Sequence, residues 1–263
     1  MASYTIEHVI DVRHWSDALF SFTTTRNPGL RFENGQFIML GLDSGRGGRI
    51  TRAYSMASAN YEDHLEFYSI KVPNGPLTSR LKFVGPGSPV LVSSKPTGTL
   101  VLRDLKPGKR LFLLATGTGV APFLAVAKDP ETYGQFEQVF LIRGARTQDG
   151  LAYADSVLAG LRTNPYLGEF VGAQFNDHPT LTREAFRNQG RITSWLETAS
   201  LSPQTDRFMV CGNMRMIDDV NRLLAARGFN VSPRIGVPGD YVIERAFVES
   251  FDTRAEQANA ASR

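Results

Sequence analysis

The 263-residue chain has 42% hydrophobic residues, 21% charged residues and a formal net charge of +3. This is an ordinary globular composition, and its weak basic excess does not indicate nucleic acid but suits an acidic protein partner. No run approaches the ~18 apolar residues of a membrane span, and the N-terminus shows no secretory signal, so we expect a cytoplasmic protein without membrane contact.

A single cysteine, Cys211, occurs in the chain. It excludes a disulfide within the chain and a four-thiolate iron–sulfur or zinc site. We therefore expect no resident metal, and electron-transfer chemistry would have to use a bound organic cofactor or a partner.

The N-terminal part of the chain favours short antiparallel strands. Turn signals such as Asn-Pro-Gly and Pro-Asn-Gly-Pro separate the apolar stretches, and residues 65–72 partly alternate, as a half-solvated strand does. Strands are expected at 6–12, 19–25, 36–42, 53–56, 65–72, 90–93 and 99–102, with one short helix at 77–84. This regular spacing predicts a small barrel or sandwich.

The pattern changes after a linker expected at 105–108. Residues 110–116 form an apolar run suited to a parallel strand that is buried on both faces. Further strands are expected at 138–143, 170–175, 207–211 and 241–247, and helices from about residue 121 and at 152–161, 192–198 and 214–227. This alternation predicts a doubly wound parallel sheet. Residues 252–263 show no core pattern and are expected to be a disordered tail or a short appended helix.

A glycine-rich segment, Ala-Thr-Gly-Thr-Gly-Val-Ala-Pro-Phe, spans residues 115–123. It follows a predicted strand and opens a predicted helix, so Gly117 and Gly119 would let the backbone approach a ligand whose pyrophosphate meets the helix N-terminus. Pro122 stands where the dinucleotide fingerprint has its third glycine. The alternative interpretation is an ordinary strand–helix turn with proline in the first helical turn.

The next strand indicates which nucleotide would bind. An NAD site usually carries an acid at the end of this strand, but Glu137 lies before it. The cationic side chains of Arg146, Arg183 and Arg191 suit a 2′-phosphate instead, which favours NADP. The alternative is a solvated basic face.

The segment Arg-Ala-Tyr-Ser at 52–55 places a guanidinium, a phenol and a hydroxyl in a predicted strand. Arginine is seldom buried without a partner. Taken by themselves, these residues leave two interpretations open. Arg52 pairs with an acid and Tyr54 is plain core, or a bound ligand supplies the partner.

Five motifs in order make the chain resemble the ferredoxin/flavodoxin–NADP+ reductase family, bacterial type. They are Arg-x-Tyr-Ser, Tyr-Ser-Ile-Lys-Val, Gly-Pro-Leu-Thr-Ser-Arg-Leu, Gly-Thr-Gly-Val-Ala-Pro-Phe and Val-Cys-Gly-Asn, and the ending Ala-Phe-Val-Glu at 246–249 looks bacterial. The resemblance covers residues 1 to about 249. It implies an antiparallel Greek-key FAD-binding barrel at 1–102, a Rossmann-like NADP(H)-binding domain at 109–249, and a tail at 250–263.

The same resemblance assigns site residues. Arg52 would pair with the FAD pyrophosphate, Tyr54 would lie flat against the isoalloxazine ring, and Ser55 would stand near flavin N5. Ala246 would face the ring where plant-type members end in an aromatic residue, and Phe247 would cover the adenine. Ser55, Cys211 and Glu249 are the expected catalytic residues. The other expected cofactor-binding residues are Ala53, Tyr68, Ile70, Lys71, Val72, Leu77, Thr78 and Ser79 for FAD, and Thr116, Gly117, Gly119, Val120, Arg146, Arg183 and Arg191 for NADP(H).

The expected activity is hydride exchange between nicotinamide C4 and flavin N5, with electrons passed singly to an acidic ferredoxin or flavodoxin. We expect a monomer. A free-flavin reductase or an oxygenase reductase component is one alternative, and a non-catalytic flavin-binding regulatory subunit is another.

Overall fold

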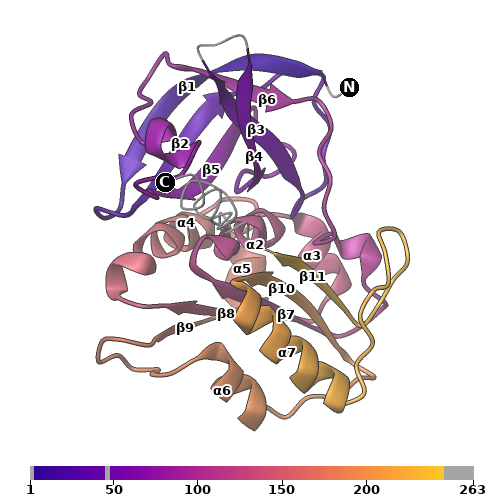
Figure 1. Cartoon of the computed structure of the whole chain (residues 1–263). Coiled ribbons are helices and arrows are strands. Elements are labelled where there is room, and N and C mark those ends of the chain that lie inside the picture. The colour runs from indigo at the N-terminus through magenta and orange to yellow at the C-terminus, as the bar shows by residue number, and fades with distance from the viewer. Residues whose placement is uncertain (1–2, 45–47, 246–263) are drawn as a thin grey trace, which may run out of the picture.

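The computed structural model describes residues 3–44 and 48–245, which form two sheets joined by one connection (Figure 1). The first sheet is antiparallel and the second is parallel, which confirms the fold class expected from the sequence. Within the described residues, no helix is long and apolar enough to cross a membrane.

Six strands build the antiparallel unit, in the order β4-β3-β6-β1-β2-β5. A bridge between Met56 and Phe67 joins the outer strands and closes the barrel. Strand β6 returns beside β3, while β3, β4 and β5 are successive neighbours, which is a Greek-key arrangement. The elements are β1 (Tyr4–His14), β2 (Leu19–Thr25), β3 (Phe37–Asp43), β4 (Arg49–Ser55), β5 (His64–Ile70), the one-turn helix α1 (Thr78–Leu81) and β6 (Pro89–Ser93).

Five parallel strands build the second unit, in the order β11-β10-β7-β8-β9. They are β7 (Arg110–Thr116), β8 (Gln138–Ala145), β9 (Phe175–Leu181), β10 (Asp206–Gly212) and β11 (Tyr241–Arg245). The strand order reverses between β7 and β10, and open α/β sheets bind their ligands outside the carboxyl ends of the strands at such a point.

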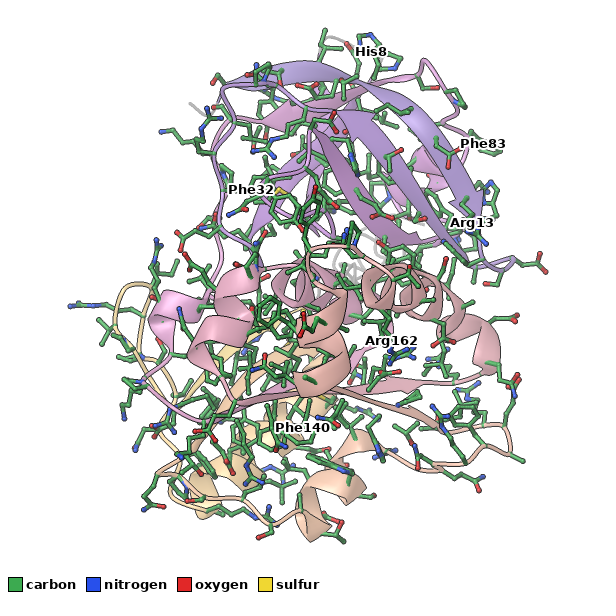
Figure 2. All side chains as sticks on the ribbon, turned by 180° about the vertical axis from the view of Figure 1, so that it is seen from behind. His8, Arg13, Phe32, Phe83, Phe140 and Arg162 are labelled. Atoms are coloured by element: carbon green, nitrogen blue, oxygen red, sulfur yellow. The ribbon has the colours of Figure 1, made fainter. Side chains whose placement is uncertain are left out.

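Helices cover both faces of this sheet. Figure 1 shows α2 to α5 between the sheet and the barrel, and α6 and α7 on the opposite face. They are α2 (Ala121–Ala127), α3 (Pro130–Gln135), α4 (Ala152–Arg162), α5 (Gly168–Gln174), α6 (Ile192–Thr198) and α7 (Met214–Ala226), with 3₁₀ turns η1 (Leu102–Asp104), η2 (Gly117–Val120) and η3 (Gln148–Gly150). Each face has its own apolar core, and Phe140, labelled in Figure 2, packs on the α6–α7 side.

Two expected strands are wrong. Residues 99–102 lie outside the barrel sheet, because Leu100 and Leu102 pack into the core beneath α2 instead. Residues 170–175 are mostly helix α5, in which Val171 is buried four residues after the buried N-cap residue Leu167. The strand begins at Phe175 and runs through Asn-Asp-His-Pro-Thr. This edge strand carries too little apolar sequence to be recognised.

The barrel and the α/β unit are in direct contact. Lys128, at the end of α2, inserts its Nζ between Glu62 (3.3 Å) and Glu66 (3.7 Å) of the barrel. The rings of Tyr68 on β5 and Tyr153 on α4 stack with centroids 4.3 Å apart. Because these contacts join β5 to α2 and α4, they set the relative position of the two sheets.

The connection between the units is equally constrained. Leu105 is 7% exposed, the Lys106 N–H donates to the Gly239 carbonyl, and Lys106 Nζ lies 3.1 Å from Asp240 Oδ1. The segment expected as a linker at 105–108 is thus attached to the α/β unit.

A substitution at Gly35 tests how closely the barrel packs against the segment that leads into this connection. The φ of Gly35 is +97°, and a Cβ placed there would lie 1.8 Å from the Leu100 carbonyl oxygen. We expect Gly35→Ala to lower the free energy of unfolding by more than about 2 kcal/mol, measured by urea denaturation. Gly160, exposed in α4 with no atom within 4 Å of its Cβ position, is the matched control. Gly160→Ala should stabilise by about 0.5–1 kcal/mol, and equal effects of both substitutions would contradict the close approach.

Candidate functional site

A cavity of about 710 Å³ lies between the barrel and the carboxyl edge of the parallel sheet. Among the predicted site residues, the barrel contributes Arg52, Ala53, Tyr54, Ser55, Tyr68, Ile70, Val72 and Thr78 to its lining, and the α/β unit contributes Thr116, Gly117, Gly119, Arg146, Arg191 and Cys211. The structure therefore brings residues from most of the sequence motifs to one place, at the point where the strand order reverses.

Three polar residues of β4, Arg52, Tyr54 and Ser55, line this cavity. The Tyr54 hydroxyl lies 2.9 Å from Ser69 Oγ, and its ring packs edge-on against Phe67. Arg52 donates from Nη1 to the Thr51 carbonyl at 2.8 Å and is half-buried. Because the guanidinium lines the cavity and is bound here to a neutral carbonyl, it suits an anionic ligand, for which a bidentate fork is well shaped.

Tyr68 supplies a direct test of whether a polar ligand fits. Its side chain is 4% exposed and lines the cavity, and its hydroxyl oxygen has no hydrogen-bond partner among the described residues. Burial raises the pKa of this phenol, so it stays protonated. Buried hydroxyls seldom lack partners, and a ligand in the cavity would supply one. The barrel wall thus fits a ligand with polar edges, as a flavin would have.

The glycine-rich loop is the 3₁₀ turn η2, and its two glycines have different roles. Gly117 adopts a φ of +56°, and a Cβ there would meet no atom within 4 Å, so the loop is open on that side. At Gly119 a Cβ would lie 2.5 Å from the Cys211 carbonyl oxygen. Gly117 therefore suits the expected approach of a ligand, whereas Gly119 is required by contact between the ends of β7 and β10.

The cysteine at the end of β10 is buried beside a carboxyl group that sequence reasoning missed. Cys211 pairs in register with Glu244 of β11, and burial, aided by that carboxylate, raises the pKa of its thiol. The Thr99 N–H donates to Glu244 Oε2 at 3.1 Å, yet desolvation dominates and raises the pKa of Glu244 to about 7. Glu244 is not among the residues that line the cavity, so it adjoins the site only through its pairing with Cys211. The signal available in the sequence was an acid on a predicted strand next to the one that ends in cysteine.

A second hollow, of about 400 Å³, adjoins the cavity at the ends of β8 and β9. It brings Arg146, Arg183 and Arg191 together, and Arg146 and Arg191 line both hollows. These three arginines are separated by up to 45 positions in the sequence, yet they converge without a carboxylate among the lining residues. The hollow has the charge and donor groups that a phosphate requires.

A buried ion cluster supports the loop that carries Arg146. Arg143 is 3% exposed and binds Asp177 at 2.8 Å, Asp155 and the Leu151 carbonyl. Desolvation lowers the pKa of Arg143, but its interactions with Asp177 and Asp155 together raise that pKa above its ordinary value. The guanidinium therefore stays charged. Arg143 is therefore a structural cation, distinct from those that line the cavity.

Several predicted site residues lie away from the cavity lining. Leu77 is in the barrel core, Val120 is in the core beneath α2, and the N–H groups of Lys71 and Ser79 bind the carbonyls of Ala18 and Gly75. Helix α1 has only one turn, so it presents Thr78 but not its neighbours to the cavity. Ala246, Phe247 and Glu249 lie outside the described residues.

Comparison with known proteins shows which family the chain belongs to. Residues 113–222 match the family model of the oxidoreductase NAD-binding domain. The chain is 52% identical to ferredoxin–NADP reductases of Azotobacter vinelandii and of Pseudomonas aeruginosa, in each case with 95% of this chain and all of the relative covered. It is 44% identical to a flavodoxin/ferredoxin–NADP reductase of Rhodobacter capsulatus, with 91% and 92% covered.

The solved structures agree. The ferredoxin NADP+ reductase of Neisseria gonorrhoeae with bound FAD and NADP has a TM-score of 0.84 and 32% identity, with 94% of this chain and all of that chain covered. High identity over nearly the whole length, the two-sheet fold and a cavity at the strand reversal lead to one conclusion: the chain belongs to the ferredoxin–NADP reductase family.

Proposed function

We propose that the chain is an FAD-dependent reductase that exchanges electrons between NADP(H) and a small one-electron carrier. The observation that supports this most directly is the cavity between the two units, which is lined by Arg52, Tyr54 and Ser55 of β4 and also by the glycine loop and Cys211. The names of its relatives favour ferredoxin as the carrier.

The residues present fit both cofactors. When bound, these supply the redox chemistry, in which a hydride moves between nicotinamide C4 and flavin N5. Arg52 would bind the FAD pyrophosphate, Tyr54 would support the isoalloxazine ring, and Ser55 would orient the flavin. The chain's own contribution is to hold the two reacting rings together and to exclude water.

Cys211 would act at the nicotinamide end, and Glu244, which pairs with it in register on β11, would lie behind it. The buried thiol stays neutral and offers a small, polarisable surface. The Glu244 carboxyl, with a pKa of about 7, can hold a proton at neutral pH. The catalytic role expected of Glu249 stays a prediction, because that residue lies outside the described ranges.

Finer features of this function remain predictions. Flavodoxin as a second carrier is supported by the relative in Rhodobacter capsulatus, which is named for both carriers. The monomeric state and cytoplasmic location come from the sequence alone. The proposed roles of Ala246 and Phe247 concern residues outside the described ranges.

An absorption spectrum tests the function. The purified protein should be yellow and release FAD rather than FMN, and anaerobic NADPH should bleach the flavin bands. The reduced protein should then reduce ferredoxin faster than free flavin. Recovery of FMN alone would contradict the pyrophosphate role of Arg52. Failure of NADPH to bleach the flavin would favour a non-catalytic flavin-binding subunit, and faster reduction of free flavin would favour a flavin reductase.

Cofactor preference should depend on the second hollow. A charge-assisted contact to phosphate contributes roughly 1.5–3 kcal/mol, so Arg146→Ala or Arg191→Ala should raise the KM for NADPH about ten- to a hundredfold. The KM for NADH should barely change, because NADH lacks the 2′-phosphate. Steady-state kinetics with both cofactors decide the matter, and an equal loss with NADPH and NADH would make these arginines structural.

The raised pKa of Glu244 predicts a pH dependence of stability. Its ordinary value is 4.5 and its folded value is about 7, so the folded state binds the proton more tightly. The stabilisation is complete below about pH 4.5 and is lost as pH rises through about 7, by up to about 3 kcal/mol. Urea denaturation of the wild type at about pH 5 and about pH 8.5 should show this fall. Glu244→Gln, which cannot ionise, should remove that part of the slope, and identical slopes in both proteins would refute the assignment.

A further inference from the structure

Four arginines line the main cavity, and the proposed function uses three of them. Arg52 belongs to the barrel wall, while Arg146 and Arg191 extend into the second hollow. The fourth, Arg215, is an exposed residue in the first turn of α7, and no sequence motif assigned it a role. Because Arg215 lines the cavity, its guanidinium is available to an anionic group of a ligand there.

The start of α7 is fastened to the end of β7. The side chain of Asn213 caps the helix by accepting from the Met216 N–H at 3.0 Å. The same residue donates from its backbone N and its Nδ2 to Thr116 Oγ1, at 3.1 Å and 3.2 Å. Thr116 directly precedes the glycine loop, so these bonds hold the first turn of α7 beside that loop.

Backbone packing brings the two segments closer still. A Cβ on Gly212 would lie 2.1 Å from Thr116 Oγ1, and a Cβ on Gly119 would lie 2.9 Å from the Gly212 nitrogen. No side chain therefore fits between the segments at these points. Arg215 lies only three residues after Gly212, and its long side chain lines the same cavity as Gly117 and Gly119.

The charge of Arg215 is not neutralised by its neighbours on the helix. Asp219, one turn further along α7, also lines the cavity but forms its ion pair with Arg222. Across the described residues, Arg215 has no carboxylate within ion-pair distance. It presents a solvated cation to the cavity that Gly117 also lines.

We propose that Arg215 binds the pyrophosphate of the nicotinamide cofactor, the part that NADP(H) and NAD(H) share. This inference rests on the proposed function and extends it to a residue outside the family motifs. Arg146 and Arg191 distinguish the two cofactors, whereas Arg215 contributes equally to both.

The strand order supports this division. The basic hollow lies at the ends of β8 and β9, Cys211 ends β10, and β7 lies between β8 and β10. A dinucleotide with its 2′-phosphate in the hollow and its nicotinamide at Cys211 must pass its pyrophosphate over the end of β7. That end carries the glycine loop, and α7, which covers the other face of the sheet, contributes Arg215 to the same cavity. Backbone N–H groups and a guanidinium together form a suitable anion site.

Binding of whole cofactor and of a fragment separates the two phosphate sites. The FAD-loaded protein is titrated by calorimetry with NADP+ and with adenosine 2′-monophosphate, which has the 2′-phosphate but no pyrophosphate. Arg215→Ala should weaken NADP+ about ten- to a hundredfold and leave the fragment unchanged. It should also lower kcat/KM for NADPH and NADH by the same factor. Arg215→Lys, which keeps the charge but loses the fork, should recover part of the affinity.

Two control variants complete the experiment. Arg162, labelled in Figure 2, is exposed at the end of α4 and is not among the residues that line the cavity, so Arg162→Ala removes the same charge and should change neither affinity. Arg146→Ala should weaken both NADP+ and the fragment. The inference is overturned if Arg215→Ala binds NADP+ as the wild type does, or loses the fragment as strongly as NADP+. A wild-type protein that fails to bind NADP+ would overturn the proposed function as well.

Discussion

The contact between the barrel and the α/β unit is the constraint on which the site depends, because the cavity has one wall in each. Lys128 is nearly buried between two barrel carboxylates and also donates to the Ala57 carbonyl at 3.1 Å. A buried cation is tolerated only with such partners, so this contact has a narrow range of geometries. The Tyr68–Tyr153 stack adds an apolar contact immediately behind the cavity wall. Together these two contacts fix the width of the cavity between the barrel and the α/β unit.

Within the α/β unit, the close approach of the ends of β7 and β10 has a similar role. Gly119 and Gly212 remove the side chains that would hold these strand ends apart, and Asn213 joins them through Thr116. Because the strand order reverses here, the two chain segments diverge to opposite faces of the sheet just beyond the contact. One place therefore collects a glycine loop, a thiol and the start of a long helix from distant parts of the sequence.

The arginines of the α/β unit divide into structural and ligand-directed groups by their partners. Arg143 is enclosed and bound by Asp155 and Asp177, and it braces the segment that leads to Arg146. Arg146, Arg191 and Arg215 line open space instead. A guanidinium costs much free energy to bury without carboxylates, so the enclosed Arg143 comes with two paired acids. The three arginines in the cavity remain available to phosphates. This division accounts for a cavity that is rich in cations although the net charge of the whole chain is only +3.

The sequence alone determined the elements whose pattern is local. Residues 19–25, 110–116 and 192–198 form β2, β7 and α6 with the expected bounds, because their residue types and apolar spacing suit those elements wherever they pack. The order of motifs was likewise enough to recognise the family. Tertiary structure decided the features that depend on contacts between residues distant in sequence. The segment 99–102 reads as a strand but packs beneath α2, and the edge strand β9 is too polar to recognise. Tertiary structure also decided which side chains reach the cavity, since Thr78 lines it while Leu77 fills the barrel core. Glu244 acquires its raised pKa only through burial beside Thr99 and Cys211, which are remote in sequence. Desolvation and charge proximity are properties of the packed chain, and no local pattern encodes them.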